Sequence, residues 1–365
     1  MFEKMVNAGV ELDVFVYGAL INAFAEAGCV EEAVRYFQIM KNAGFVGNSV
    51  VYSSLIKVYS KRGFLKEAQE TYKRIQKLGV EPDAFLSGCM LDLYARTDMV
   101  TEAQEVFKVL KEKQQANEFS FSMMLSLYKK NGRLNEATEI AKEMLESGFL
   151  TNVLSFNSVI SLFIADGRLR EAAEVFHQML KLKASPNENT YKTLGILLKR
   201  GGIPRDTVDQ LDVARKSGLP HGIQALRMTI FSAAGMHAEA LEACDELRAS
   251  GLDFDVFSYN AVIYALGSAG RINEAYNMFM IMQAKGLEPD TITYASMTIS
   301  YGKLGLVDGV RRMFYKMKQK GFQPNEFMFK AVIDAYKSAG KFALARFVTQ
   351  EREFMHQLQD HGHII

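Results

Sequence analysis

The stretch "SAGRINEAYNMFMIMQAKGLEPDTITYASM" (Ser268–Met297) holds a helix-like pattern, a glycine, a Pro-Asp pair and then a new apolar run. Nearly the same order of residues occurs much earlier, in "KRGFLKEAQETYKRIQKLGVEPDAFLSGCM" (Lys61–Met90). The chain therefore repeats itself. A fixed period of this length is the signature of a fold that stacks copies of one small unit.

From residue 14 onward the 365-residue chain divides into ten repeats, of which eight are 35 residues long, the third is 34 and the sixth is 33. They begin at residues 14, 49, 84, 118, 153, 188, 221, 256, 291 and 326, and the last ends at 360. Residues 1–13 match the second half of a repeat, so we expect the chain to start inside a longer array. Residues 361–365 form a tail. Repeats six and seven (188–255) are degenerate, and we expect a kink or altered curvature there.

Two positions of the repeat are nearly constant. The fifteenth is glycine in nine of ten repeats, with Asp98 as the exception: Gly28, Gly63, Gly132, Gly167, Gly202, Gly235, Gly270, Gly305 and Gly340. The twentieth is alanine in eight: Ala33, Ala68, Ala103, Ala137, Ala172, Ala240, Ala275 and Ala345. A glycine ends a helix because it adopts the left-handed cap conformation at little cost. The alanines mark the place where two helices approach closely.

The eighth repeat shows how each unit folds. Apolar residues at helical spacing predict a first helix from Val256 to about Ala269, ended by Gly270. A second helix starts near Asn273 and stops at Gly286, before Pro289. One such pair cannot bury its apolar stripe alone, but stacked pairs bury a continuous core. We predict an all-α, right-handed α-solenoid whose first helices line the concave face.

Composition excludes several classes of protein. No apolar run approaches the ~20 residues of a membrane span. The three cysteines are far apart, so no disulfide framework is expected. The formal net charge is only +1, so the binding of a polyanion would have to rest on the local placement of Lys and Arg.

The repeats resemble those of a known family. Tetratricopeptide repeats want a tryptophan early in the unit, and this chain has none. The phrases "VFSYNAVIYALGSAGRINEAYNMFMIMQAKGLEPD", "SVVYSSLIKVYSKRGFLKEAQETYKRIQKLGVEPD" and "VLSFNSVISLFIADGRLREAAEVFHQMLKLKASPN" instead look like pentatricopeptide repeats of the P class. The resemblance covers residues 1–360. It implies single-stranded RNA as the partner, with about one base read per repeat, and an organellar site of action, chloroplast or mitochondrion, in a plant-type source.

In that family the fifth and last residues of a repeat read the base, and the second is an apolar wedge between bases. Four repeats carry matching pairs: Ser53 with Asp83 (favouring G), Ser122 with Asn152 (A), Asn157 with Asn187 (C, then U) and Asn260 with Asp290 (U). The implied wedges are Val50, Phe85, Phe119, Leu154, Phe257 and Ile292. Four other repeats have Gly18, Gly88, Ala225 or Ala295 at the fifth position, and two have Lys192 or Lys330. The target then reads N-G-N-A-C/U-N-N-U-N-N.

The thirteenth residue of the repeat is basic in five repeats, at the C-terminal end of the first helix. One interpretation is compensation of the helix dipole. The other is contact with RNA phosphates, for which the candidates are Lys61, Arg96, Lys130 and Lys303. The two interpretations are compatible.

Catalysis has little support in the sequence. It has no CxxC pair, no phosphate-binding glycine loop and no zinc-deaminase pattern, so we expect no enzyme, no cofactor and no metal. His361 and His363 are interpreted as part of the chain terminus, not as metal ligands. The leading hypothesis is an RNA-binding adaptor that acts in the stabilisation, processing, splicing or translation of organellar transcripts. The alternative is a protein-interaction scaffold that uses the same groove.

Overall fold

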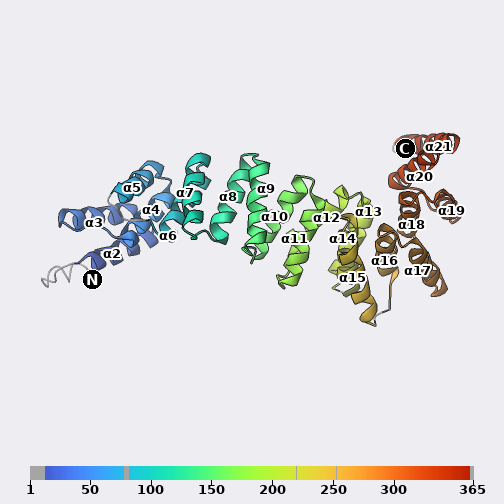
Figure 1. Cartoon of the computed structure of the whole chain (residues 1–365), viewed down its shortest axis with the longest axis horizontal. Coiled ribbons are helices and arrows are strands. Elements are labelled where there is room, and N and C mark those ends of the chain that lie inside the picture. The colour runs from blue at the N-terminus through green and yellow to red at the C-terminus, as the bar shows by residue number, and fades with distance from the viewer. Residues whose placement is uncertain (1–12, 78–81, 219, 252, 362–365) are drawn as a thin grey trace. The chain divides into compact units, whose positions relative to one another are not determined.

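The computed structural model describes residues 13–77, 82–218, 220–251 and 253–361, which form only helices and no strand (Figure 1). Most of the predicted partial repeat (1–13) and of the tail (361–365) lies outside these residues, as do the side chains of His361 and His363. The chain divides into two compact units, residues 1–158 and 159–365. The helix α10 (Val153–Ala165) spans this division.

In the N-terminal unit the helices alternate in two layers (Figure 1). The first helices contact one another in chain order: α2 (Val14–Glu26), α4 (Ser49–Arg62), α6 (Ala84–Arg96) and α8 (Glu118–Lys130). Each also packs against its own second helix: α3 (Val30–Asn42), α5 (Leu65–Lys77), α7 (Val100–Glu112) and α9 (Leu134–Glu146). The unit is therefore an α-solenoid of helical repeats, as the sequence predicts.

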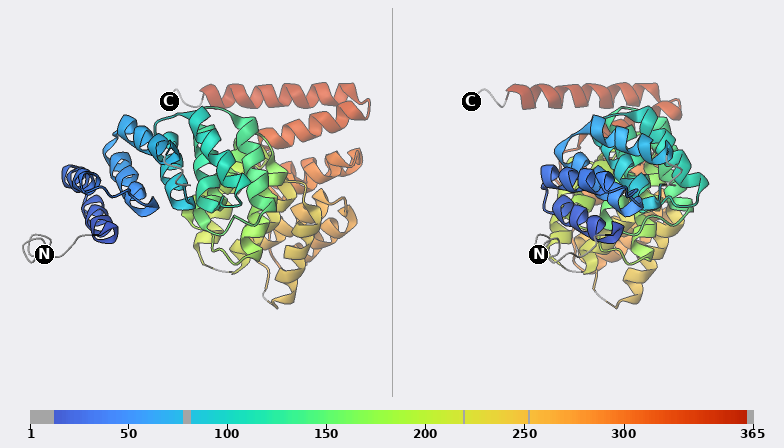
Figure 2. Two further views of the ribbon diagram at one scale, coloured as in Figure 1. Left: turned by 60° about the vertical axis from the view of Figure 1, so that its left-hand side comes forward. Right: turned by 90° about the vertical axis from the view of Figure 1, so that its left-hand side faces the viewer.

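The C-terminal unit repeats this plan over most of its length. The first helices α14 (Pro220–Ala233), α16 (Val256–Ser268), α18 (Thr291–Lys303) and α20 (Glu326–Ser338) form one row. Their partners are α15 (His237–Ala249), α17 (Ile272–Ala284), α19 (Val307–Gln319) and α21 (Phe342–His361). Figure 2 shows α21 as the long final helix beside α20. The unit also holds α11 (Leu169–Lys181), α12 (Glu188–Arg200) and α13 (Arg205–Lys216).

The turn between the two helices of a pair always contains a left-handed residue. All nine glycines of the fifteenth position have a positive φ, between 68° and 84°. Asp98, the exception in sequence, adopts the same conformation with a φ of 58°. The turn geometry is thus common to all ten pairs, and only the third pair forms it without glycine.

The core lies between the two layers. The eight alanines of the twentieth position are buried, with at most 2% of their surface exposed. Aromatic rings connect successive repeats: Phe107 of α7 lies 5.0 Å from Phe121 of α8, and Phe279 of α17 lies 5.8 Å from Tyr294 of α18, measured between ring centroids. Burying such pairs contributes hydrophobic and aromatic contact energy that a lone helix pair lacks.

The sixth repeat departs from the regular plan, inside the segment 188–255 where the sequence predicts a kink. Its second helix, α13, packs closely on α14 of the next repeat. Only residues 217–219 connect the two helices, and Gly222 brings the backbones together: an added Cβ there would lie 2.1 Å from the carbonyl oxygen of Ala214. A short connection of this kind favours antiparallel neighbours.

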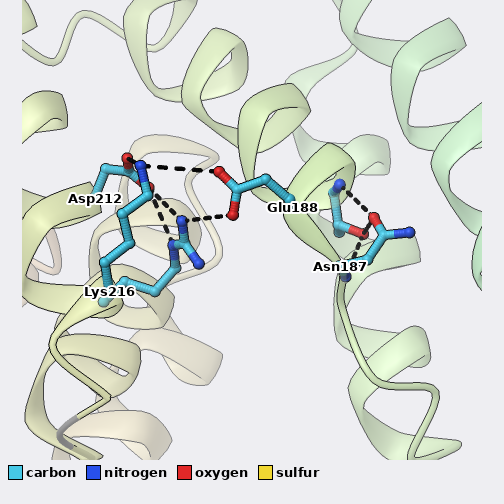
Figure 3. Close-up of polar contacts among 6 residues, drawn as sticks. Asn187, Glu188, Asp212 and Lys216 are labelled. Carbon is cyan, nitrogen blue, oxygen red and sulfur yellow. Dashed lines mark hydrogen bonds and ion pairs between the residues drawn. The ribbon is translucent and has the colours of Figure 1, made fainter.

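A cluster of charges ties the end of α13 to the start of α12 (Figure 3). The Arg215 guanidinium lies 2.6 Å from an Asp212 carboxylate oxygen and 3.1 Å from a Glu188 carboxylate oxygen. The same guanidinium lies 4.2 Å from the centroid of the Tyr191 ring. Lys216 adds a 2.6 Å contact to Asp212. The cluster therefore fixes the C-terminal end of α13.

Candidate functional site

A row of large apolar side chains is exposed at the second residue of the first helices in the N-terminal unit. Their exposed fractions are 78% for Phe15, 58% for Val50, 58% for Phe85, 50% for Phe119 and 75% for Leu154. Each stands in the first turn of its helix. A folded chain usually buries such side chains, so a repeated exposed row at one register marks a binding surface.

The corresponding residues in the C-terminal unit are less exposed. Phe327 is 38% exposed, and both Phe257 and Ile292 are half-buried. All three line one cavity, described below.

The last residue of a repeat has a structural role that the sequence reasoning did not include. Its side chain accepts a hydrogen bond from the backbone N–H three residues later, as in an N-cap. Nine residues do this: Asp13, Asn48, Asp83, Asn117, Asn152, Asn187, Asp255, Asp290 and Asn325. An Asn or Asp followed three residues later by Ser or Thr, as in "NEFS" and "DTIT", was the available signal.

The predicted pair Ser53 and Asp83 is joined through a third residue. The Ser53 hydroxyl donates to the backbone carbonyl of Ser49 at 2.8 Å. The Ser49 hydroxyl in turn donates to the Asp83 carboxylate at 2.6 Å. Ser53 is buried, with 3% of its surface exposed.

In the pair Ser122 and Asn152, only the last residue contacts Glu118, the first residue of the repeat. Asn152 donates from its amide to the Glu118 carboxylate at 2.7 Å, and the Thr151 hydroxyl donates to the same group. Burial raises the pKa of Glu118, but hydrogen bonds from Ser155 and Thr151 outweigh burial and lower it overall. Ser122 is half-buried beside this network, and Asn152 is exposed.

The remaining predicted pairs differ from each other. Asn157 is buried in the N-terminal unit, whereas Asn187 caps α12 in the C-terminal unit. Asn260 and Asp290 are in direct contact: the Asn260 amide donates to the two Asp290 carboxylate oxygens at 3.1 and 3.2 Å. The Asn260 carbonyl accepts from the Thr293 hydroxyl. Asn260 is therefore held in one orientation, with 6% of its surface exposed.

A cavity of about 470 Å³ lies on the first-helix layer of the N-terminal unit. It brings together the predicted wedges Phe85 and Phe119, the fifth-position Gly88 and the candidate phosphate contact Arg96. Cys89 also lines it, and burial raises the pKa of this thiol to about 11. The cavity is thus lined by the two apolar wedges together with the charged residues Lys57, Asp92 and Arg96.

A second cavity, of about 310 Å³, lies in the C-terminal unit. Phe257, Ile292 and Phe327 line it together with the fifth-position residues Asn260, Ala295 and Lys330 of the same three repeats and the basic Lys303. The structure therefore gathers the second and fifth residues of repeats eight to ten around one space.

The predicted phosphate contacts have different surroundings. Arg96 lies 2.9 Å from the Asp92 carboxylate on its own helix, and Lys130 lies 2.6 Å from the Asp98 carboxylate. Lys303 is exposed at the rim of the C-terminal cavity. The side chain of Lys61 lies outside the described residues. Two of the four cations are thus already neutralised by a carboxylate of the chain itself.

Within the part of the chain that the structure describes, no three His, Cys, Asp or Glu side chains come together in a way that could hold a metal ion. None of the helices formed by these residues has both the length and the apolar character of a membrane crossing.

Three models of repeat families match the sequence. The PPR repeat family model matches residues 151–194 and 254–298, and the pentatricopeptide repeat domain model matches residues 1–62. The PPR repeat model matches residues 50–80, 87–114, 119–149 and 292–322. Together these matches take in more than half of the chain, and they leave out residues 195–253, which include α13 and α14.

Known proteins are similar to parts of the chain. A pentatricopeptide repeat-containing protein of Arabidopsis thaliana is 44% identical over 172 residues, which are 47% of this chain and 17% of that protein. A second one from the same plant is 58% identical over 45 residues, or 12% of this chain and 5% of that protein. The crystal structure of the maize pentatricopeptide repeat protein PPR10 aligns with a TM-score of 0.41 and 23% identity, over 96% of this chain and 55% of that one. The chain thus spans less than a fifth of the curated relatives.

Proposed function

Because this chain belongs to the pentatricopeptide repeat family, we propose that it binds single-stranded RNA along its first-helix layer, with about one base for each repeat. The observation that carries the proposal is the row of exposed apolar side chains at the second residue of successive repeats. Bases stack on apolar and aromatic side chains whatever their sequence, and each such contact contributes about 1–3 kcal/mol.

Base selectivity in this proposal comes from the fifth and last residues. A serine hydroxyl or an asparagine amide can meet the Watson–Crick edge of a base that lies between two wedges. We assign this role to Ser53 with Asp83, Ser122 with Asn152, Asn157 with Asn187, and Asn260 with Asp290. Capping does not exclude reading, because each carboxylate or amide has further lone pairs or N–H groups.

The proposed mode of action is occupancy of the RNA, without chemistry. A protein that covers a single-stranded stretch blocks exonucleases and changes which parts of the transcript can pair. Transcripts of a chloroplast or mitochondrion are the proposed targets, since the relatives are plant proteins. On this proposal the ten repeats at 14–360 act as a binding array and not as an enzyme.

The first test is equilibrium binding of a fluorescent 12-mer RNA containing G-N-A-C-N-N-U, against a scrambled RNA and the equivalent DNA, at two salt concentrations. The variants Ser122→Ala and Asn260→Ala should weaken binding only to RNA that carries their matching base. Ser126→Ala is the matched control for Ser122→Ala, because Ser126 is an exposed serine on the same helix, α8. Equal binding of all RNAs by wild type and both variants would contradict base reading.

A second pair of variants tests the wedges. Phe119→Ala should weaken RNA binding at least fivefold, since a stacking contact contributes about 1–3 kcal/mol. Phe347→Ala on α21 is the control, because Phe347 is 58% exposed, similar to the 50% of Phe119, but lies on a second helix. A loss of similar size in both variants would argue against a stacking role for the first-helix row.

The alternative function is a protein-interaction scaffold. The specific observation in its favour is that Arg96 and Lys130 are paired with Asp92 and Asp98, which leaves fewer cations for phosphates. RNA binding should fall steeply with salt, because bound phosphates release counterions. If the chain binds no RNA at low salt, the scaffold becomes the better proposal, and capture of a protein partner by the same exposed row would support it.

A further inference from the structure

Repeats eight to ten line most of the cavity in the C-terminal unit, but part of its lining comes from α13, a helix of the sixth repeat. Residues of α16, α18 and α20 line most of it. The remaining lining comes from residues 201–204, from Thr207, Gln210 and Leu211 of α13 in the sixth repeat, and from Thr229 of α14. The first helices contact one another in the order α14, α16, α18, α20, and α13 contacts α14. The helices α13 and α20 are therefore the two ends of this row.

Two features hold α13 in this position. The close approach at Gly222 sets the backbone of its last turn against the start of α14. The charge cluster of Arg215, Asp212 and Glu188 ties the same end to α12 (Figure 3). The N-terminal half of α13 is then presented to the cavity by a fixed helix, which is the condition for a defined contact with a ligand.

The part of α13 that lines the cavity carries two polar residues, Thr207 and Gln210, beside the apolar Leu211. Gln210 is exposed, and among the described residues its side chain has no hydrogen-bond partner. Thr207, one turn earlier, is half-buried beside it. A glutamine amide offers two N–H groups and a carbonyl with two lone pairs. Gln210 and Thr207 line the same cavity as Ile292 and Phe327.

The rest of the lining includes the polar residues Ser296, Lys330 and Asp334, but the fifth position of the ninth repeat offers no such group. The fifth residue of the ninth repeat is Ala295, whose side chain cannot form a hydrogen bond. The neighbouring Asn260 already donates to Asp290 and accepts from Thr293. A base between Ile292 and Phe327 would thus meet no hydrogen-bonding side chain at the fifth position of the ninth repeat, and at its last position it would meet only Asn325, whose side chain also caps α20.

We propose that Gln210, supported by Thr207, reads the base that lies between Ile292 and Phe327, from the wall formed by α13. This inference rests on the proposed RNA function and names a contact outside the fifth and last positions. The cavity volume of about 310 Å³ matches the lower end of the range of small-ligand sites, as one enclosed nucleotide would require. A glutamine amide pairs in two places with adenine, through N6 and N7, so adenine is the assigned base.

The test is selection of RNA from a random library by the whole chain, followed by affinity measurements on the enriched sequence. Wild type should enrich a motif with adenine at the ninth-repeat position. Gln210→Ala should flatten this one column and weaken binding of the adenine RNA roughly tenfold, the equivalent of about 1.4 kcal/mol. Gln210→Glu should change the preference from adenine to cytosine, because a carboxylate accepts from the cytosine N4 amino group.

Gln178→Ala is the matched control, since Gln178 is an exposed glutamine on the second helix α11 that does not line the cavity. If wild type binds and enriches no RNA, the proposed function itself fails. If wild type enriches a motif that Gln210→Ala leaves unchanged, or that Gln178→Ala flattens equally, the assignment of Gln210 is overturned and the proposed function stands. A crosslink from 8-azidoadenosine at that position to residues 205–216 would support the assignment independently of affinity.

Discussion

Replacing Gly222 by alanine gives a sharp test of how α13 is placed. In most helices this change is favourable, because alanine exceeds glycine in helix propensity by up to about 1 kcal/mol. Here the new Cβ would lie 2.1 Å from the carbonyl oxygen and 2.4 Å from the carbonyl carbon of Ala214. These are backbone atoms, so no rotamer change relieves the contact, and α13 must move away from α14. Overpacking costs about 1–3 kcal/mol, and we expect a net loss of roughly 2 kcal/mol.

Hydrogen exchange with mass spectrometry measures this loss locally, which suits a chain of stacked repeats better than a single unfolding curve. Peptides from α13 and α14 should exchange roughly 30-fold faster in Gly222→Ala, the equivalent of about 2 kcal/mol. Gly195→Ala on α12 is the control, because its Cβ would meet Val208 at 3.7 Å, an ordinary contact. It should slow exchange slightly. If Gly222→Ala exchanges no faster than wild type, the close approach of α13 and α14 is refuted.

Three further predictions concern single residues. Asp98→Gly should raise the free energy of unfolding by about 0.5–1 kcal/mol, measured by thermal unfolding. It removes the cost of about 1–2 kcal/mol of a non-glycine residue in the left-handed conformation, but it also loses the exposed ion pair with Lys130, which contributes about 0–1 kcal/mol. A lower melting temperature would mean that the loss of the ion pair dominates. Asp255→Ala removes the cap of α16 and should cost about 1 kcal/mol, seen as faster amide exchange in its first turn, whereas unchanged exchange would argue against the cap. Burial raises the pKa of Cys89 to about 11, so its thiolate is scarce at pH 8, and alkylation by iodoacetamide should stay slow until the pH approaches that value. Labelling at pH 8 as fast as in the urea-unfolded chain would contradict this, and bound RNA should slow it further.

Local signals in the sequence were sufficient to predict the helices and the turns between them. The glycine column predicted left-handed turns because few other residues adopt a positive φ, and all nine glycines do so. The alanine column predicted close helix pairs because a larger side chain would not fit, and all eight alanines are buried. These features depend on residues near one another in the chain.

The placement of α13 could not be predicted in the same way. The short sixth repeat and the degenerate segment 188–255 indicated an irregular region, but they did not show which helix α13 would pack against. The packing of α13 depends on the backbone contact at Ala214 and on charged residues that are far apart in the sequence, such as Glu188 and Arg215. Thr207 and Gln210 do not occupy the second, fifth or last position of their repeat, so repeat positions alone could not identify them.

Several contacts of the predicted site residues could not be predicted from the sequence. The hydrogen bond between Asn260 and Asp290 needs two residues 30 positions apart, and only the structure shows it. The involvement of Ser49 and Glu118 with the last residues of their repeats was equally hidden. The assignment of bases to these pairs stays a prediction until RNA binding is measured.

The N-caps formed by the last residues restrict how the specificity of such a chain can change, in evolution or by design. A last residue that caps the next helix must do so whatever base it meets, so the substitutions open to it are the few good caps: Asn, Asp, Ser and Thr. The exception in this chain is Pro220, which is itself the first residue of α14. The fifth position has no such duty and accepts Gly88, Ser122, Asn260 and Lys330 in this one chain. Mutational paths to a new target should therefore pass first through the fifth position. An engineer who recodes the last position with any other residue would trade specificity for a frayed helix.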